Sequence, residues 1–146
     1  MLPHSAYFID PLHSTGIAHT LYGIDLLMQN IGTASGLQKY EESIQSQARL
    51  IDQLIHGSYL CLDDFDKFSQ YVMLYFAGAD FTERQRRTGK VPDFLQSHNK
   101  DFCDTVRVLH KQLCVGDFNP DIVRSAIEPW NAVGFCDPSK NNMYPH

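Results

Sequence analysis

The stretch FIDPLHSTGIAHTL, residues 8–21, is the most informative part of the sequence for predicting fold and function. Pro11 fixes its own φ and biases the residue before it toward an extended backbone. Ser14 and Thr15 are residue types that often cap the start of a helix, and Gly16 lets another group approach the backbone closely. The stretch therefore predicts the end of a strand, a tight turn and the start of a helix.

A helix over residues 15–30 is predicted by the apolar spacing after the turn. The residues of this stripe are Ile17, Leu21, Ile24, Met28 and Ile31. The start of such a helix presents free backbone N–H groups and a partial positive charge, which suit a phosphate, a halide or an electron-rich ring edge. We expect the stripe to be buried against later helices or against a second copy in a homo-oligomer. A stripe that normally packs on a missing domain would instead be exposed.

The motif DPLHSTGIA, residues 10–18, runs into this amphipathic helix and resembles a known flavoprotein motif. It is similar to the C-terminal flavin-contacting motif of FAD-dependent oxidoreductases of the tryptophan-halogenase-like and aromatic-hydroxylase type. The resemblance covers about residues 3–31 and, more loosely, the tail at 129–138. It implies that the turn and the helix start lie beside the isoalloxazine ring of FAD, near a halide site. The residues it implies for cofactor binding are His4, Asp10, Pro11, Ser14, Thr15, Gly16 and Ile17.

Two positions depart from the pattern of that family. His4 stands where relatives carry an Asp that binds the ribitol or ribose region of the flavin. His13 stands where tryptophan halogenases carry a Glu immediately before Ser-Thr-Gly. The resemblance therefore implies that His13 is the catalytic residue and that the substrate is a small molecule. It does not imply that this substrate is tryptophan.

The chain has no G-x-G-x-x-G run, which an FAD enzyme of this type needs to hold the pyrophosphate. We expect the C-terminal part of a larger α/β flavoprotein, inactive alone and completed by a missing N-terminal FAD domain or an equivalent subunit. Residues 1–34 would be the flavin-contacting turn and helix of the incomplete FAD domain. Residues 35–146 would be a C-terminal helical region, with the boundary in a loop at Gly32–Gly36.

The remaining sequence predicts a mainly α fold with about five packed helices. Helical patterns cover residues 37–57, 63–89, 91–116 and 119–128, and the last begins at Asn119-Pro120, a strong helix start. The 18 residues from Pro129 hold three prolines, three asparagines and a glycine, so we expect an irregular tail. Trp130, Val133 and Phe135 should pin part of that tail to the body.

Composition excludes several classes of function. A net charge of −5 offers no basic field for nucleic acid, and no apolar run approaches the ~18 residues that a transmembrane helix needs. We see no secretory signal, and the four cysteines form no C-x-x-C pair. These features predict a cytoplasmic protein with reduced thiols.

The seven histidines do not form a recognisable metal motif in the sequence. His13 and His19 are six residues apart, which is not the spacing of a helical ligand pair, and no H-E-x-x-H occurs. Cys103 and Cys114 read as core or interface residues. We therefore predict no metal site, and two alternatives to the flavoprotein stay open: a free-standing helical interaction module that keeps the turn as scaffold, and a helical metalloenzyme.

Overall fold

The computed structural model describes residues 7–90, 93–137 and 139, and this part of the chain is mainly helical and contains no strand. The α-helices are α2 (Gly16–Asn30), α3 (Ala34–Leu60), α4 (Phe65–Tyr71), α5 (Met73–Arg87), α6 (Lys100–Cys114) and α7 (Val123–Ile127). Short 3-10 helices are η1 (Pro11–His13), η2 (Phe94–Gln96), η3 (Pro120–Ile122) and η4 (Glu128–Trp130). Because only Val72 separates α4 from α5, the predicted mainly α fold of about five helices is confirmed. Residues 7–9 have no regular structure, so the strand end expected there is absent.

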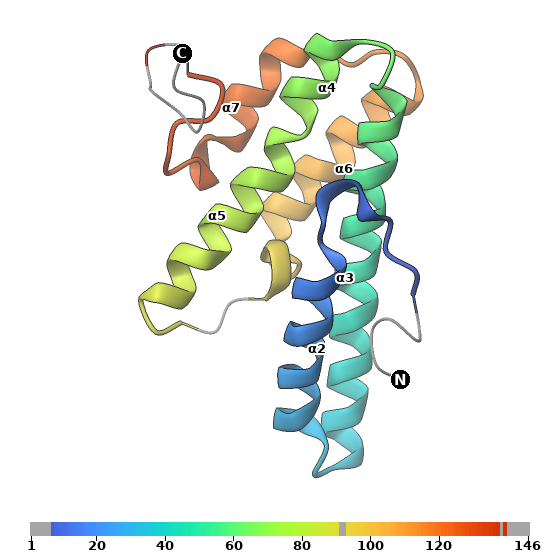
Figure 1. Ribbon diagram of the computed structural model, residues 1–146, viewed down its shortest axis with the longest axis vertical. Coiled ribbons are helices and arrows are strands. Elements are labelled where there is room, and N and C mark those ends of the chain that lie inside the picture. The colour runs from blue at the N-terminus through green and yellow to red at the C-terminus, as the bar shows by residue number, and fades with distance from the viewer. Residues whose placement is uncertain (1–6, 91–92, 138, 140–146) are drawn as a thin grey trace.

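Helices α2 and α3 form an antiparallel hairpin that extends from the rest of the molecule (Figure 1). The Thr33 side chain caps α3 by accepting a hydrogen bond from the Gly36 N–H at 3.0 Å. A Cβ at Gly36 would lie 2.3 Å from the carbonyl oxygen of Asn30, so glycine is needed where the two helices meet. The loop predicted at residues 32–36 is therefore wrong in extent, since α3 already begins at Ala34.

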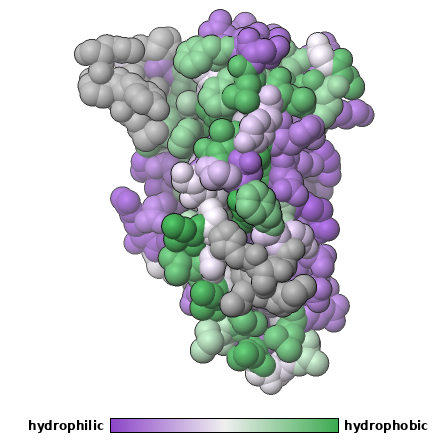
Figure 2. All heavy atoms as spheres, turned by 45° about the vertical axis from the view of Figure 1, so that its right-hand side comes forward, coloured by the Kyte–Doolittle hydropathy of each residue, from purple (hydrophilic) through white to green (hydrophobic). Residues whose placement is uncertain are grey.

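The apolar stripe of α2 faces solvent, and its expected burial against later helices is wrong. Ile17 is 75% exposed, Leu21 63% and Met28 68%. The buried face of α2 consists instead of His19, Tyr22 and Gly23. Aromatic packing sets the orientation of α2, because the Phe94 ring of η2 packs against the rings of both His19 and Tyr22, with centroids 5.3 and 5.7 Å away. Figure 2 shows apolar surface gathered at the lower end of the molecule, where the α2–α3 hairpin lies.

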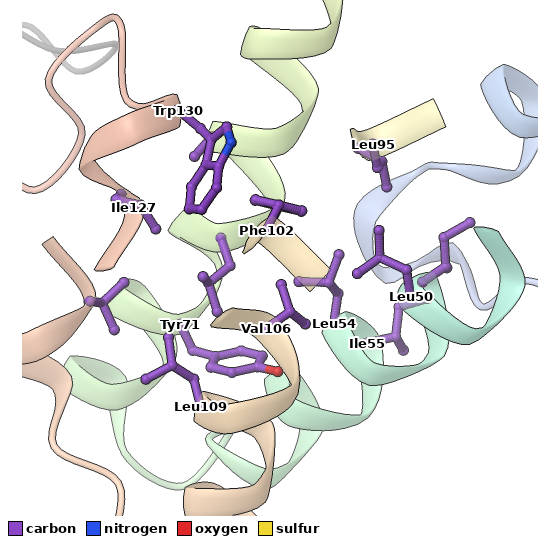
Figure 3. Packing of buried hydrophobic residues seen from close by; sticks show 14 of the residues in the cluster. Leu50, Leu54, Ile55, Tyr71, Leu95, Phe102, Val106, Leu109, Ile127 and Trp130 are labelled. Atoms are coloured by element: carbon purple, nitrogen blue, oxygen red, sulfur yellow. The ribbon is translucent and has the colours of Figure 1, made fainter. Parts of the chain in front are cut away.

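The core lies where α3, α5 and α6 meet the C-terminal segments (Figure 3). Phe102 of α6 is fully buried and meets the Trp130 ring edge-on, with centroids 5.1 Å apart. Tyr71 is also fully buried, and its hydroxyl donates to the carbonyl of Gln53 on α3 at 3.0 Å. Trp130 and Phe135 are buried, so the part of the tail that holds them is pinned to the body as expected.

Two helical boundaries differ from the sequence-based prediction for local reasons. The pattern at 63–89 is broken at Val72 into α4 and α5. The helix start expected at residues 91–92 lies outside the described residues. Further along the chain, α6 begins at Lys100, where Asn99 caps it by accepting from the Phe102 N–H at 3.1 Å. In the described part of the chain, no helix is both long and apolar enough to cross a bilayer.

Candidate functional site

The turn η1 is held to α3 through one carboxylate. Asp10 caps the turn by accepting from the Leu12 N–H at 2.9 Å, and Ser14 closes it with an N–H that donates to the Pro11 carbonyl at 2.8 Å. The Tyr59 hydroxyl of α3 donates to both Asp10 carboxylate oxygens, at 3.1 and 3.0 Å. The hydrogen bond to Asp10 raises the pKa of Tyr59. The turn is therefore set in place by a partner 49 residues away in the sequence.

His13 is the last residue of the turn and is held on two sides. Its Nε2 lies 3.2 Å from the Ser58 hydroxyl. Because Ser58 donates its single hydroxyl proton to the Leu54 carbonyl at 2.8 Å, His13 must donate through Nε2–H. The imidazole also stacks on the Tyr75 ring, with centroids 4.5 Å apart and planes 9° from parallel. In its neutral form, His13 therefore carries the proton on Nε2 and keeps Nδ1 as an acceptor.

An apolar pocket opens beside His13. Its volume is about 340 Å³. Its walls come from the turn and from α4 and α5, and the lining residues are Leu12, His13, Phe65, Phe68, Ser69, Val72, Met73 and Phe76. Aromatic and aliphatic walls with a single imidazole suit a small apolar or aromatic molecule whose orientation is set by one polar contact. The pocket thus places one titratable group against a lining that is otherwise apolar except for Ser69.

The start of α2 leaves backbone donors open next to this histidine. Thr15 precedes the helix and is 1% exposed, but its side chain makes no capping hydrogen bond. Its hydroxyl instead donates to the Tyr75 hydroxyl at 3.4 Å. Within residues 7–90, 93–137 and 139, the N–H groups of Gly16 and Ile17 have no hydrogen-bond partner. Two unsatisfied donors and the positive end of the helix dipole therefore lie beside the turn.

The structure brings together most of the residues that the sequence singled out. The turn and helix start are continuous, and the residues gathered there are Asp10, Pro11, His13, Ser14, Thr15, Gly16 and Ile17. His4 lies outside the described residues. Sequence reasoning missed Ser58, Tyr59 and Tyr75, which hold His13, Asp10 and Thr15. They lie 45 to 60 residues away on α3 and α5, so no local spacing pointed to them.

We expect His13 to make the protein less stable in acid. Burial lowers the pKa of His13 below its ordinary 6.5, and the Asp10 carboxylate only partly opposes this. Below that ordinary value the unfolded chain binds a proton at His13 more readily than the folded chain, so stability falls as pH decreases. Urea unfolding at pH 7.5 and pH 5.5 should show a smaller loss on acidification for His13→Gln. Ser69→Ala, in the same pocket, is the control and should keep the wild-type loss; an unchanged loss in His13→Gln would contradict the expectation.

A scan against protein-family models, a search of curated proteins and a search of solved structures each found no match for this chain.

Proposed function

We propose that this chain is the C-terminal portion of an FAD-dependent oxidoreductase of the halogenase-like or monooxygenase-like kind. The observation that carries the proposal is the apolar face of α2, which is exposed and begins at an uncapped helix start. A partner that buries this face and an electron-rich group at the helix start would satisfy both features. A flavin-binding domain of a larger α/β flavoprotein supplies the two together.

The helix start suits one edge of a flavin ring. Among the described residues, the N–H groups of Gly16 and Ile17 have no hydrogen-bond partner, and Gly16 has no side chain that would keep a planar ring away from the backbone. FAD, when bound, supplies the redox chemistry of the enzyme. The two N–H groups and the helix dipole would stabilise negative charge at the edge of a bound flavin ring, with a helix-end contribution of roughly 0.3–1 kcal/mol, rising to ~2 kcal/mol when partly buried.

The exposed face of α2 supports a docking role for the first helix. Ile17, Leu21, Ile24, Met28 and Ile31 lie on one side of it, and all five are exposed. Contiguous apolar surface of this kind marks an interaction site in soluble proteins. Because the face starts at the donors of Gly16, a domain that covers it brings its cofactor to the helix start. The occupant that we propose is an FAD domain, in the same chain or on a separate subunit.

His13 is the group that we propose for proton transfer to or from the substrate. The 340 Å³ pocket beside it is walled by Phe65, Phe68 and Phe76, which favours a small aromatic substrate. The lowered pKa of His13 keeps its ring neutral at pH 7, with Nδ1 free to accept a proton. Ser58 and Tyr75 fix the ring so that it need not reorganise during the reaction.

The residues of the turn and the start of α2 suit one edge of the flavin ring, but they do not suffice to bind the whole dinucleotide. The sequence offers no glycine-rich cradle for the pyrophosphate, so the chain alone does not recover the cost of ordering FAD. A free-standing helical interaction module is the second candidate function, favoured by the same exposed face of α2. The two candidates differ in one respect, since only the flavoprotein requires FAD at the helix start.

The substitution Gly16→Val in the complete flavoprotein tests the proposed function. Its side chain would stand between the backbone donors and the ring, so flavin affinity should fall or the reduction potential should become more negative. Gly32→Val is the matched control, because a Cβ at Gly32 meets nothing within 4 Å. Flavin fluorescence titration and a redox titration measure both effects. Unchanged affinity and potential in a folded Gly16→Val protein would rule out the helix start as the flavin contact.

A further inference from the structure

Two histidines and a cysteine meet on the surface between α3 and α6. Nδ1 of His56, on α3, lies 2.8 Å from Nε2 of His110, on α6. Cys114 is one turn further along α6, and its Sγ lies 3.8 Å from the same His110 nitrogen. One ligand atom from each of the three residues can be chosen so that all lie within 4.8 Å of one another. His56 and Cys114 are exposed and His110 is partly buried, so an ion can enter from solvent.

These distances are close to those that a tetrahedral ion imposes. Zn²⁺ binds imidazole nitrogen at about 2.0–2.1 Å and thiolate sulfur at about 2.3 Å, which places two nitrogens about 3.3 Å apart and nitrogen and sulfur about 3.6 Å apart. The histidine pair needs to open slightly and Cys114 needs to move slightly inward. Both changes are small side-chain movements at the surface.

We propose that His56, His110 and Cys114 form a binding site for Zn²⁺, with water in the fourth position. Imidazole and thiolate are the ligands that a borderline-soft divalent ion prefers over oxygen. When Zn²⁺ binds, the Cys114 thiol loses its proton to solvent. The proton shared between the facing histidine nitrogens moves to the far nitrogen of its ring, so that each ring turns a lone pair to the ion.

The site links two helices that pack along each other, α3 and α6 (Figure 1). Because its ligands come from both, Zn²⁺ binds the folded chain better than the unfolded chain and stabilises it. The cluster was not expected from the sequence, where we weighed only His13 with His19 and Cys103 with Cys114. The cluster is separate from the His13 pocket, and the zinc proposal does not depend on the flavoprotein proposal.

Zinc titration of the purified, reduced chain tests the proposal. We expect one Zn²⁺ per chain by calorimetry, and an unfolding midpoint raised by about 5–10 °C at a hundredfold excess over the dissociation constant. Each of His56→Gln, His110→Gln and Cys114→Ser should weaken binding about tenfold or more. Co²⁺ should give a thiolate charge-transfer band that Cys114→Ser abolishes.

Two variants serve as matched controls. Cys103→Ser removes another α6 cysteine, and His98→Gln removes another exposed histidine; both should bind Zn²⁺ as the wild type does. Circular dichroism checks that all variants are folded, which we expect because His56 and Cys114 are exposed. The proposal is overturned by binding below one equivalent, by no shift in the unfolding midpoint, or by Zn²⁺ affinity that survives in folded His110→Gln and Cys114→Ser.

Discussion

Replacing Phe102 with alanine is expected to destabilise the protein by about 3–5 kcal/mol, the range for deleting a fully buried phenylalanine ring. The ring is fully buried and meets Trp130 edge-on. A Cβ at Gly78 would lie 2.7 Å from its tip, so α5 approaches this ring as closely as glycine allows. Removing it leaves a cavity that separates α6 from both α5 and the C-terminal segment.

Urea unfolding measures this loss, and Phe65→Ala is the matched control. Phe65 has the same side chain but is 79% exposed, so its removal should change stability by no more than about 0.5 kcal/mol. If Phe102→Ala does not fold, Phe102→Leu should still show a measurable loss. Equal effects at Phe102 and Phe65 would contradict the packing described for the core.

The second large effect concerns self-association through α2. At high concentration the purified chain should associate, because two exposed apolar faces can cover each other. Leu21→Asp combined with Met28→Asp should convert it to a monomer and abolish the binding of hydrophobic dyes. Sedimentation velocity measures the change.

Val108→Asp combined with Val115→Asp is the control for charge and exposure. Val108 of α6 is 54% exposed and Val115, directly after α6, is 68% exposed, so the pair adds the same two charges outside the α2 face. The control should leave self-association unchanged. A wild-type chain that stays monomeric and binds no dye would show that the α2 face does not mediate self-association. A control variant that is monomeric as well would show the same.

The sequence predicts helices well where a cap and a periodic stripe agree. Asn119 caps the η3–α7 segment as expected, and α3 covers the whole helical pattern predicted at residues 37–57. The stripe of α2 shows the limit of the same reasoning. Periodicity reveals that one face is apolar, but only the tertiary contacts of His19 and Tyr22 with Phe94 decide which face is buried.

The same difference between local and long-range information applies to the two candidate sites. The Asp10–Ile17 turn could be found because its residues are contiguous, whereas its supports Ser58, Tyr59 and Tyr75 come from distant helices. Two of the three proposed zinc ligands did leave a local signal, since His110 and Cys114 are four residues apart on one helix face. Its third ligand, His56, is 54 residues from His110, and only the packing of α3 on α6 brings it there.

We propose that α2 and the turn before it dock against a flavin-binding domain. The most direct test is to purify the tagged protein from the cell in which it occurs, under native conditions, and to measure bound FAD. The account predicts about one FAD per chain, accompanied by a segment or subunit with a G-x-G-x-x-G fingerprint. Leu21→Asp with Met28→Asp should lose the FAD, and Val108→Asp with Val115→Asp should keep it. A colourless wild-type protein without FAD would contradict the account.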